Sequence, residues 1–294
     1  MRVGLQQCTY TWAGGAAVIP EQLAAIAVNA EAVGFSSFWL MDHLHQIPGW
    51  GSPEIDPMLE AYTALGFVAA RTSRIRLGTL VAGAIYRHPA VAIKAAATLD
   101  VLSSGRAYFG IGAAWFEREA VALGIPFPPT RERFSVLEDV VRMARQTWAG
   151  DVRPFVGKTV TAPAPAQNPL PLSRPRLPIL IAGRGPSRTL GLVARYADAW
   201  NVIAAPEEGP RFLKALRERC AAFGRDPGEI ETTVLDPEDW RREADPNYAW
   251  SEEWERARLR SWRSIGFDHV IVNMQDAHDP AKLRRYGEVI ASLN

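Results

Sequence analysis

The segment Ala107-Tyr-Phe-Gly-Ile-Gly-Ala-Ala-Trp115 joins a short apolar run to a cluster of small residues, and a stretch of helical composition follows it. Such a run predicts a buried strand, and seven similar runs are spaced along the chain. They are Val3–Gln7, Phe35–Met41, Ile75–Val81, Pro178–Ala182, Ala199–Ile203, Glu231–Leu235 and His269–Asn273. A helical stretch follows each strand, ending with Pro280–Leu293. Eight strand–helix units predict an α/β fold, the closed parallel (β/α)₈ or TIM barrel, with its active site at the C-terminal ends of the strands.

The composition indicates a single soluble domain that acts on a small molecule. A length of 294 residues, of which 48% are hydrophobic and 22% charged, fits one barrel spanning residues 1–294. The net charge of +1 argues against a nucleic acid or an acidic membrane as the main partner, because both need a basic surface. No apolar run reaches the ~20 residues of a membrane-spanning helix.

The N-terminal residues and the two cysteines indicate a cytoplasmic protein. Met1 leads directly into a predicted strand, without the layout of a signal peptide. Cys8 and Cys220 lie far apart and form no Cys-x-x-Cys pattern, so neither a disulfide framework nor a zinc site is predicted. No group of His, Asp and Glu has the spacing of metal ligands, and we expect no metal.

Three segments interrupt the strand–helix pattern. The stretch His43–Asp56 is longer than the ~2–6 residues usual between a strand and a helix, and is predicted to form a loop over the barrel mouth. The stretch Arg153–Pro178 contains seven prolines, which cannot donate to a β-ladder, so it is predicted to be an irregular excursion or an edge hairpin. The aromatic-rich stretch Asp236–Glu255 is either a loop packed on the barrel or a wall or lid of the substrate site.

Asp42 and His43 close the second predicted strand. A carboxylate beside an imidazole at the open end of a barrel can orient the ring or tune a proton donor. Because adjacent residues on a strand point to opposite sides, we expect His43 to face the ligand and Asp42 to support it. The alternative is that Asp42 caps the following loop and His43 lies on the surface.

Small residues end the fourth predicted strand, from Gly110 to Ala114. Without bulky side chains, a flat ring or a phosphate can approach the backbone there, although a tight turn is the alternative reason for them. Trp115 could form a wall against a ring. Glu117 either contacts polar groups of a ligand or begins a helix favourably for its dipole.

The turn Ala182-Gly-Arg-Gly-Pro-Ser187 joins the fifth predicted strand to a helix predicted over Thr189–Tyr196. Free N–H groups at a helix N-terminus make an anion site, and Arg184 adds a positive charge. The alternative is a simple turn in which Ser187 is the N-cap. Near the third strand, His88 precedes Pro89 and is predicted to cap a helix, not to act as a catalyst.

Seven segments in this order resemble the bacterial luciferase-like flavin enzyme superfamily, and most closely its branch that uses the deazaflavin coenzyme F420. They are Met41–His43, Ser73–Thr79, Arg87–Pro89, Gly110–Glu117, Gly124–Pro129, Arg131–Phe134 and Ala194–Trp200. The similarity covers residues 1 to about 205 and resumes at Gly266–Asn273.

The resemblance implies a flavin or deazaflavin at the C-terminal mouth of the barrel. Its ring would rest over a bulge at Leu80-Val81, where relatives often carry a non-prolyl cis peptide bond. Asp42 and His43 would lie beside the ring, with His43 near the place of hydride transfer. The residues that would line the ring and ribityl chain are Gly112, Ala113, Ala114 and Trp115, and those that would hold the phosphate are Gly183, Arg184, Gly185, Pro186 and Ser187.

The resemblance also implies the reaction. In some deazaflavin-dependent relatives a glutamate just after the strand-four glycines donates a proton; here Trp115 has that place and Glu117 lies two residues on. The sequence predicts an F420-dependent oxidoreductase that moves a hydride between the deazaflavin and a small organic substrate, and that forms a homodimer as its relatives commonly do. The alternatives are an FMN-dependent monooxygenase that uses reduced flavin and O₂, and a barrel that binds the cofactor without catalysis.

Overall fold

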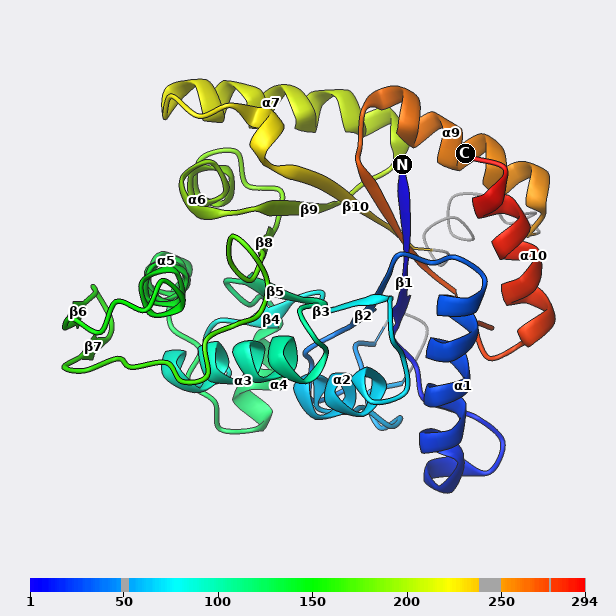
Figure 1. The fold of residues 1–294 in the computed structure, drawn as a ribbon, viewed down its shortest axis with the longest axis horizontal. Helices are drawn as coiled ribbons and strands as arrows, with labels where there is room; N and C mark the ends of the chain where they lie inside the picture. Colours follow the sequence, from blue (N-terminus) through cyan, green and yellow to red (C-terminus); the bar gives the residue numbers. More distant parts are fainter. Residues whose placement is uncertain (49–52, 238–249, 275, 294) are drawn as a thin grey trace.

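The computed structural model describes residues 1–48, 53–237, 250–274 and 276–293, and all eight predicted strands are present in it (Figure 1). The third predicted strand is divided into two pieces, β3 and β4. The strands of the barrel are β1 (Arg2–Gln7), β2 (Ser37–Leu40), β3 (Arg76–Thr79), β4 (Ala82–Gly83), β5 (Ala107–Gly112), β8 (Ile179–Ala182), β9 (Ala199–Ile203), β10 (Glu231–Pro237) and β11 (His269–Asn273).

These strands close into a parallel barrel, which confirms the predicted fold class. The strand order is β3-β2-β1-β11-β10-β9-β8-β5, and β5 pairs back with β3 through Leu77↔Ala107 and Gly78↔Tyr108. Beyond the interruption, β4 pairs with the same strand through Gly83↔Gly112. Each of the eight strands from β3 to β5 in this order thus has two neighbours, so the barrel is closed.

Leu80 and Val81 lie in the interruption between β3 and β4, and the peptide bond between them is cis, as the resemblance implies. The neighbouring β5 carries Gly110 at this level. A Cβ atom there would lie 1.9 Å from the carbonyl oxygen of Thr79, so only glycine fits beside the bulge.

Helices surround the strands, and Figure 1 shows them as an outer ring. They are α1 (Ile19–Ala32), α2 (Ala61–Ala69), α3 (Pro89–Leu102), α4 (Glu117–Ala122), α5 (Thr130–Trp148), α6 (Arg188–Tyr196), α7 (Gly209–Ala222), α9 (Glu252–Ile265) and α10 (Pro280–Ala291), with 3₁₀ turns η1 (Gly15–Val18), η2 (Pro206–Glu208) and η3 (Pro227–Glu229). His88 caps α3 by accepting a hydrogen bond from the N–H of Ala90, as predicted. Helix α2 begins at Ala61, where the carboxylate of Glu60 accepts hydrogen bonds from the N–H groups of Tyr62 and Thr63.

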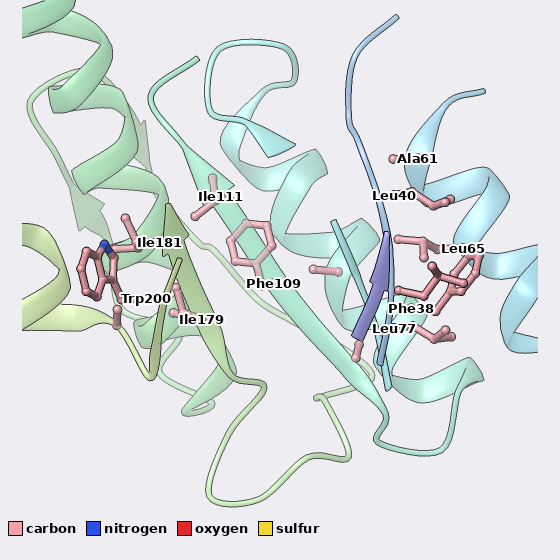
Figure 2. Close-up of a cluster of buried hydrophobic side chains, with 14 of the residues drawn as sticks. Phe38, Leu40, Ala61, Leu65, Leu77, Phe109, Ile111, Ile179, Ile181 and Trp200 are labelled. Carbon is pink, nitrogen blue, oxygen red and sulfur yellow. The ribbon is translucent and has the colours of Figure 1, made fainter. Parts of the chain in front are cut away.

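The apolar core has two layers because successive side chains of a strand point to opposite faces. Inside the barrel, Trp39, Tyr108 and Leu180 belong to one buried cluster. Outside it, the residues next to them in sequence pack under the helices. Figure 2 shows this outer layer, with Phe38 and Leu40 of β2 against α2.

The proline-rich stretch forms no barrel strand, which confirms the prediction for residues 153–178. It contains a two-stranded antiparallel hairpin of β6 (Phe155–Val156) and β7 (Thr161–Ala162), which lies outside the helix ring beside α5 in Figure 1. Within the described part of the chain, no helix has the length and apolar character needed to cross a membrane. Nor does any group of three or more His, Cys, Asp or Glu among the described residues form a candidate metal site.

Candidate active site at the C-terminal mouth of the barrel

A cavity of about 550 Å³ lies at the C-terminal ends of the strands, where the fold predicts the site. Its volume is in the range typical of small-molecule and cofactor pockets. Its lining residues are Gln6, Met41, Asp42, His43, Ile47, Leu80, Val81, Ala82, Gly83, Tyr86, Gly112, Ala113, Ala114, Trp115, Phe134, Ala182, Gly183, Arg184, Thr189, Asn201, Ile203 and Leu235. Most of these residues are apolar, and the few polar ones come from strands, from the connections after strands and from the start of α6.

One wall of the cavity is formed by the strand-three bulge and the end of β5. Leu80 and Val81 line it, and the side-chain amide of Gln6 donates to the carbonyl of Leu80 at 3.3 Å. Opposite the bulge, a Cβ atom on Gly112 would lie 3.0 Å from a methyl group of Val81. Small residues continue through Ala114, which has a φ of 60°. This wall of the cavity therefore consists largely of backbone and small side chains, against which a flat ring could lie.

Trp115 stands at the rim of the cavity with 57% of its surface exposed. Its indole meets the ring of His43 edge to face, with centroids 5.8 Å apart, and lies 5.3 Å from the ring of Phe116. An exposed aromatic ring beside a cavity can cover the apolar face of a ligand.

His43 is bound on one edge by Glu119 of α4. Its Nδ1 lies 2.9 Å from Oε2 of Glu119, and the hydroxyl of Tyr86 donates to the same oxygen at 2.6 Å. The other carboxylate oxygen, Oε1, accepts from the backbone N–H groups of Leu44 at 2.5 Å and His45 at 2.8 Å. Burial acts to raise the pKa of Glu119, but the hydrogen bonds from His43 and Tyr86 outweigh it and lower the pKa to about 2.

Asp42 also lines the cavity, although its carboxylate is engaged by Arg87. The guanidinium donates two hydrogen bonds to it, at 2.5 and 2.8 Å, and a further one to Glu60. Burial raises the pKa of Asp42, and Arg87 acts against that rise. Asp42 and His43 both reach the cavity because β2 ends at Leu40, so the alternation of a strand no longer applies to them.

The turn after β8 leads into α6 and approaches the cavity through Gly183, Arg184 and Thr189. A Cβ atom on Gly183 would lie 3.1 Å from the Thr189 side chain, and one on Gly185 would lie 3.0 Å from it. The absence of side chains on both glycines therefore allows Thr189 to pack closely against the turn. Ser187 is the N-cap residue of α6 but makes no side-chain capping hydrogen bond. The helix N-terminus and a guanidinium at the cavity edge are the features of an anion site.

Arg184 forms an ion pair with Glu208, which lies in the connection between β9 and α7. Its guanidinium lies 3.0 Å from Oε1 of Glu208, which also pairs with Arg211. Its side chain is half exposed. An anion at the turn would therefore compete with Glu208 for this guanidinium.

The structure brings together most residues that the sequence proposes for the site. Those that line the cavity are Asp42, His43, Leu80, Val81, Gly112, Ala113, Ala114, Trp115, Gly183 and Arg184, and those outside its lining are Glu117, Gly185, Pro186 and Ser187. Glu117 begins α4 and is exposed. Residues 49–52 of the predicted loop His43–Asp56 and residues 238–249 of the stretch Asp236–Glu255 lie outside the described residues, so neither prediction can be followed there.

Sequence reasoning missed Glu119, Tyr86 and Thr189. Glu119 lies two residues beyond Glu117 on the same short helix, and its neighbour Ala120 is also buried. The sequence gives no signal for this inward-facing position, because a six-residue helix is too short for hydrophobic periodicity to show its buried face.

The chain is similar in sequence to known proteins over most of its length. The family model described as luciferase-like monooxygenase matches residues 4–279. An F420-dependent glucose-6-phosphate dehydrogenase of Kineococcus radiotolerans is 36% identical over 223 residues, which cover 73% of this chain and 63% of that protein. A phthiodiolone/phenolphthiodiolone dimycocerosates ketoreductase of Mycobacterium tuberculosis is 35% identical over 243 residues, 74% of this chain and 61% of that protein. The chain thus matches less than two thirds of the length of both relatives.

Solved structures share the fold across the whole chain. An F420-dependent secondary alcohol dehydrogenase, in complex with an F420–acetone adduct, superimposes with a TM-score of 0.81 at 20% identity and covers 100% of this chain and 99% of its own. A monooxygenase from Streptomyces bottropensis gives a TM-score of 0.80, also at 20% identity and with the same coverage. At these identities the likeness shows the (β/α)₈ barrel alone.

Proposed function

The chain belongs to the luciferase-like monooxygenase family, and on this premise we propose that it is an F420-dependent oxidoreductase. It would move a hydride between C5 of the deazaflavin and a small organic substrate. The relatives named as a dehydrogenase and a ketoreductase support an alcohol and carbonyl pair as the substrate class.

The observation that carries the proposal is the combination of a flat, unobstructed wall with an anion site at one cavity. Leu80, Val81 and Gly112–Ala114 would hold the ring, and the turn at Gly183–Ser187 with Thr189 would hold the phosphate. Bound there, coenzyme F420 supplies the ability to accept or donate a hydride. The protein supplies position, an apolar surround and a place for the proton.

His43 would manage the proton. When an alcohol becomes a carbonyl, its hydroxyl proton must leave, and Nε2 of His43 would take that proton and return it in the reverse direction. Trp115 would cover the substrate from the solvent side, since its ring lies next to that of His43. Asp42, engaged by Arg87, would help to fix the segment that carries His43.

Titration with each cofactor tests the proposal, because ten tryptophans give a strong fluorescence signal. We expect coenzyme F420 to bind at least about tenfold tighter than FMN, a difference of roughly 1.4 kcal/mol. Equal or tighter binding of FMN would favour the FMN-dependent monooxygenase. Binding of coenzyme F420 without turnover of any alcohol or carbonyl would favour the barrel that only binds the cofactor.

A pair of variants tests the phosphate turn in the same titration. We expect Gly185→Asp to abolish cofactor binding, because its carboxylate repels the phosphate and crowds the N–H groups of the turn. Gly185→Ala adds a Cβ atom at the same place, 3.0 Å from Oγ1 of Thr189, without the charge. Weakened binding in both would indicate crowding alone, and unchanged binding in a folded Gly185→Asp variant would remove this turn as the phosphate site.

We also propose a homodimer, as relatives of the resembled branch commonly form. Self-complementary pairing of outer helices about a two-fold axis is the commonest way for such a protein to associate. Light scattering over a wide concentration range tests this, and a monomer mass throughout would contradict it.

A further inference from the structure

We propose that Glu119 is a positioning residue that holds His43 as the Nδ1–H tautomer, so that Nε2 is the proton-accepting nitrogen at the cavity. The kinetic consequence rests on the proposed function. The tautomer itself does not, because it follows from contacts within the protein.

The hydrogen bonds of Glu119 determine which histidine nitrogen carries the proton. Leu44 and His45 give backbone N–H groups to Oε1, and a backbone N–H can only donate. Tyr86 gives its hydroxyl proton to Oε2 at 2.6 Å. An ionised carboxylate only accepts, so the 2.9 Å contact with His43 requires a proton on Nδ1.

The carboxylate is ionised where these contacts form. The Glu119 side chain is fully buried, which alone would raise its pKa. The hydrogen bonds from His43, Tyr86 and the backbone of His45 outweigh that effect and lower the pKa to about 2. At neutral pH the group is a fixed negative charge that contacts the edge of the imidazole opposite to Nε2.

The other charged and titratable groups near His43 do not replace Glu119. Asp42 precedes it in sequence and is engaged by two hydrogen bonds from Arg87, which also binds Glu60. Tyr86 is neutral, because burial and its bond to Glu119 raise the pKa of its hydroxyl. Trp115 and Phe116 contribute only ring faces and edges. Among the described contacts, Glu119 is therefore the group that stabilises His43 once Nε2 takes a proton.

The hydrogen bonds of Glu119 join two segments that lie far apart in the sequence. Glu119 lies on α4, whereas the segment 43–45 follows β2, about 75 positions earlier. A purely structural role would be to fasten this helix to that segment. The positioning role makes a further claim, which is the state of the imidazole.

Glu119→Gln separates the two roles because the surroundings fix the orientation of the amide. The two backbone N–H groups at Oε1 require the amide oxygen there, so the NH₂ group takes the place of Oε2. It then donates to Nδ1 of His43, which must lose its proton, and the neutral ring becomes the Nε2–H tautomer. The variant keeps the contacts of α4 and reverses the tautomer.

The first measurement is ¹⁵N NMR of the histidine rings in the cofactor-free protein, where long-range coupling patterns distinguish the two tautomers. The chain has five histidines, and the signals of His43 are those lost in His43→Gln. We expect Nδ1–H in the wild-type protein and Nε2–H in Glu119→Gln. The same tautomer in both proteins, or Nε2–H in the wild-type protein, would overturn the proposal whatever cofactor the protein uses.

The second measurement is the pH profile of turnover with coenzyme F420 and an alcohol that the wild-type enzyme oxidises. We expect Glu119→Gln to lower kcat by roughly 10²–10⁴, with a smaller change in KM. Loss of the negative charge also disfavours the imidazolium, so the acid limb of the profile should move to lower pH. A variant that loses thermal stability but keeps the wild-type kcat and profile would show a structural role alone.

Two variants serve as references. Glu218→Gln removes one negative charge from the exposed face of α7 and should leave tautomer, kcat and profile unchanged. Tyr86→Phe removes one donor from Oε2 and leaves more of its charge to His43, so the acid limb should move to higher pH. If Tyr86→Phe and Glu119→Gln shift the limb in the same direction, the assignment of charge to Glu119 is wrong.

Discussion

The side chains around His43 come from separate parts of the chain. Glu119 of α4 binds Nδ1, Tyr86 shares that carboxylate, and Trp115 and Phe116 pack against the ring. One edge of the imidazole is thus fixed by the protein, and the residue lines the cavity. A ring held in this way has few orientations to lose when a ligand binds, which favours reaction geometry.

Replacement of His43 by alanine tests whether it acts on the substrate. We expect kcat to fall by roughly 10²–10⁴, the usual contribution of a positioned acid or base. Cofactor affinity should change much less, because the strand-three bulge and the phosphate turn would provide most of the binding. Turnover and a melting curve measured on the same preparation distinguish catalysis from packing, and a near-normal kcat would remove His43 from the mechanism.

The sequence located His43 but not its partner, for a physical reason. Asp42 and His43 end a strand, and strand ends of a parallel barrel meet at one face, so position along the chain predicts position in the site. Glu119 comes from a helix that must turn one face inward, and the sequence does not show which. Glu117 and Glu119 both suit the first turn of α4, where acidic residues interact well with the helix dipole. Only the tertiary packing of α4 determines that Glu119 is buried and Glu117 is exposed.

At the scale of elements, a buried carboxylate attaches the end of the proline-rich excursion to α3 and to the start of β5. Asp100 lies near the end of α3 and is fully buried. One of its oxygens accepts from the N–H groups of Leu172 and Ser173 at 2.7 and 2.9 Å. The other accepts from the hydroxyl of Ser173 at 2.6 Å and from the N–H of Ala107 at 3.3 Å. The excursion and the start of β5 therefore share one anchor.

Asp100→Ala should destabilise the protein by about 2–5 kcal/mol, because it leaves buried N–H groups without an acceptor. Chemical denaturation measures this change, and limited proteolysis should cut first within residues 163–178. Asp151→Ala is a suitable reference, since the Asp151 carboxylate pairs with the exposed Arg153 near the hairpin and should contribute little to stability. Equal stability of the two variants would show that the excursion is held by its apolar contacts.

The excursion also shows what element-level prediction can and cannot give. Seven prolines predicted correctly that residues 153–178 form no barrel strand, since each proline removes a ladder donor. The place where the excursion docks depends on Asp100, which lies about 70 positions away in a helix. A buried aspartate in a helix has no local signature, because its partners are backbone groups that any sequence supplies.

At the scale of the whole molecule, the two ends of the barrel have different tasks. The site lies at the C-terminal ends, and a closed network of polar side chains lies at the N-terminal ends. There His269 contacts Glu231 at 2.8 Å and the hydroxyl of Ser37 at 2.9 Å. Glu231 also accepts from Tyr108 at 2.7 Å and pairs with Arg2 at 2.9 Å. Each of these residues lies at or near the start of a different strand, so the network joins the strands where no ligand is expected.

This network predicts how stability depends on pH. Burial lowers the pKa of His269. Just below the usual pKa of histidine, this side chain is therefore protonated in the unfolded chain but neutral in the native protein. Stability should therefore be complete above about pH 6.5 and decline below it, by up to about 1.4 kcal/mol per pH unit. Burial acts to raise the pKa of Glu231, but its bond with His269 and the charge of Arg2 help to lower it to about 2. The stabilisation from this carboxylate is complete above about pH 4.5 and is lost towards pH 2.

Comparison of the wild-type protein with His269→Gln isolates the first of these two ranges. Glutamine keeps a donor for Glu231 and a polar contact for Ser37 but does not titrate, and the other four histidines are common to both proteins. We expect the variant to be less stable than the wild-type protein at pH 7.5, because glutamine does not reproduce the ring geometry. The difference in the free energy of unfolding should shrink as the pH falls from 6.5 to 5. In this range the unfolded wild-type chain is stabilised by protonation of His269, whereas the variant has no titrating group at that position. Denaturant unfolding at several pH values measures this, and parallel stability curves would show that the pKa of His269 is the same in the native and the unfolded chain, contrary to the prediction.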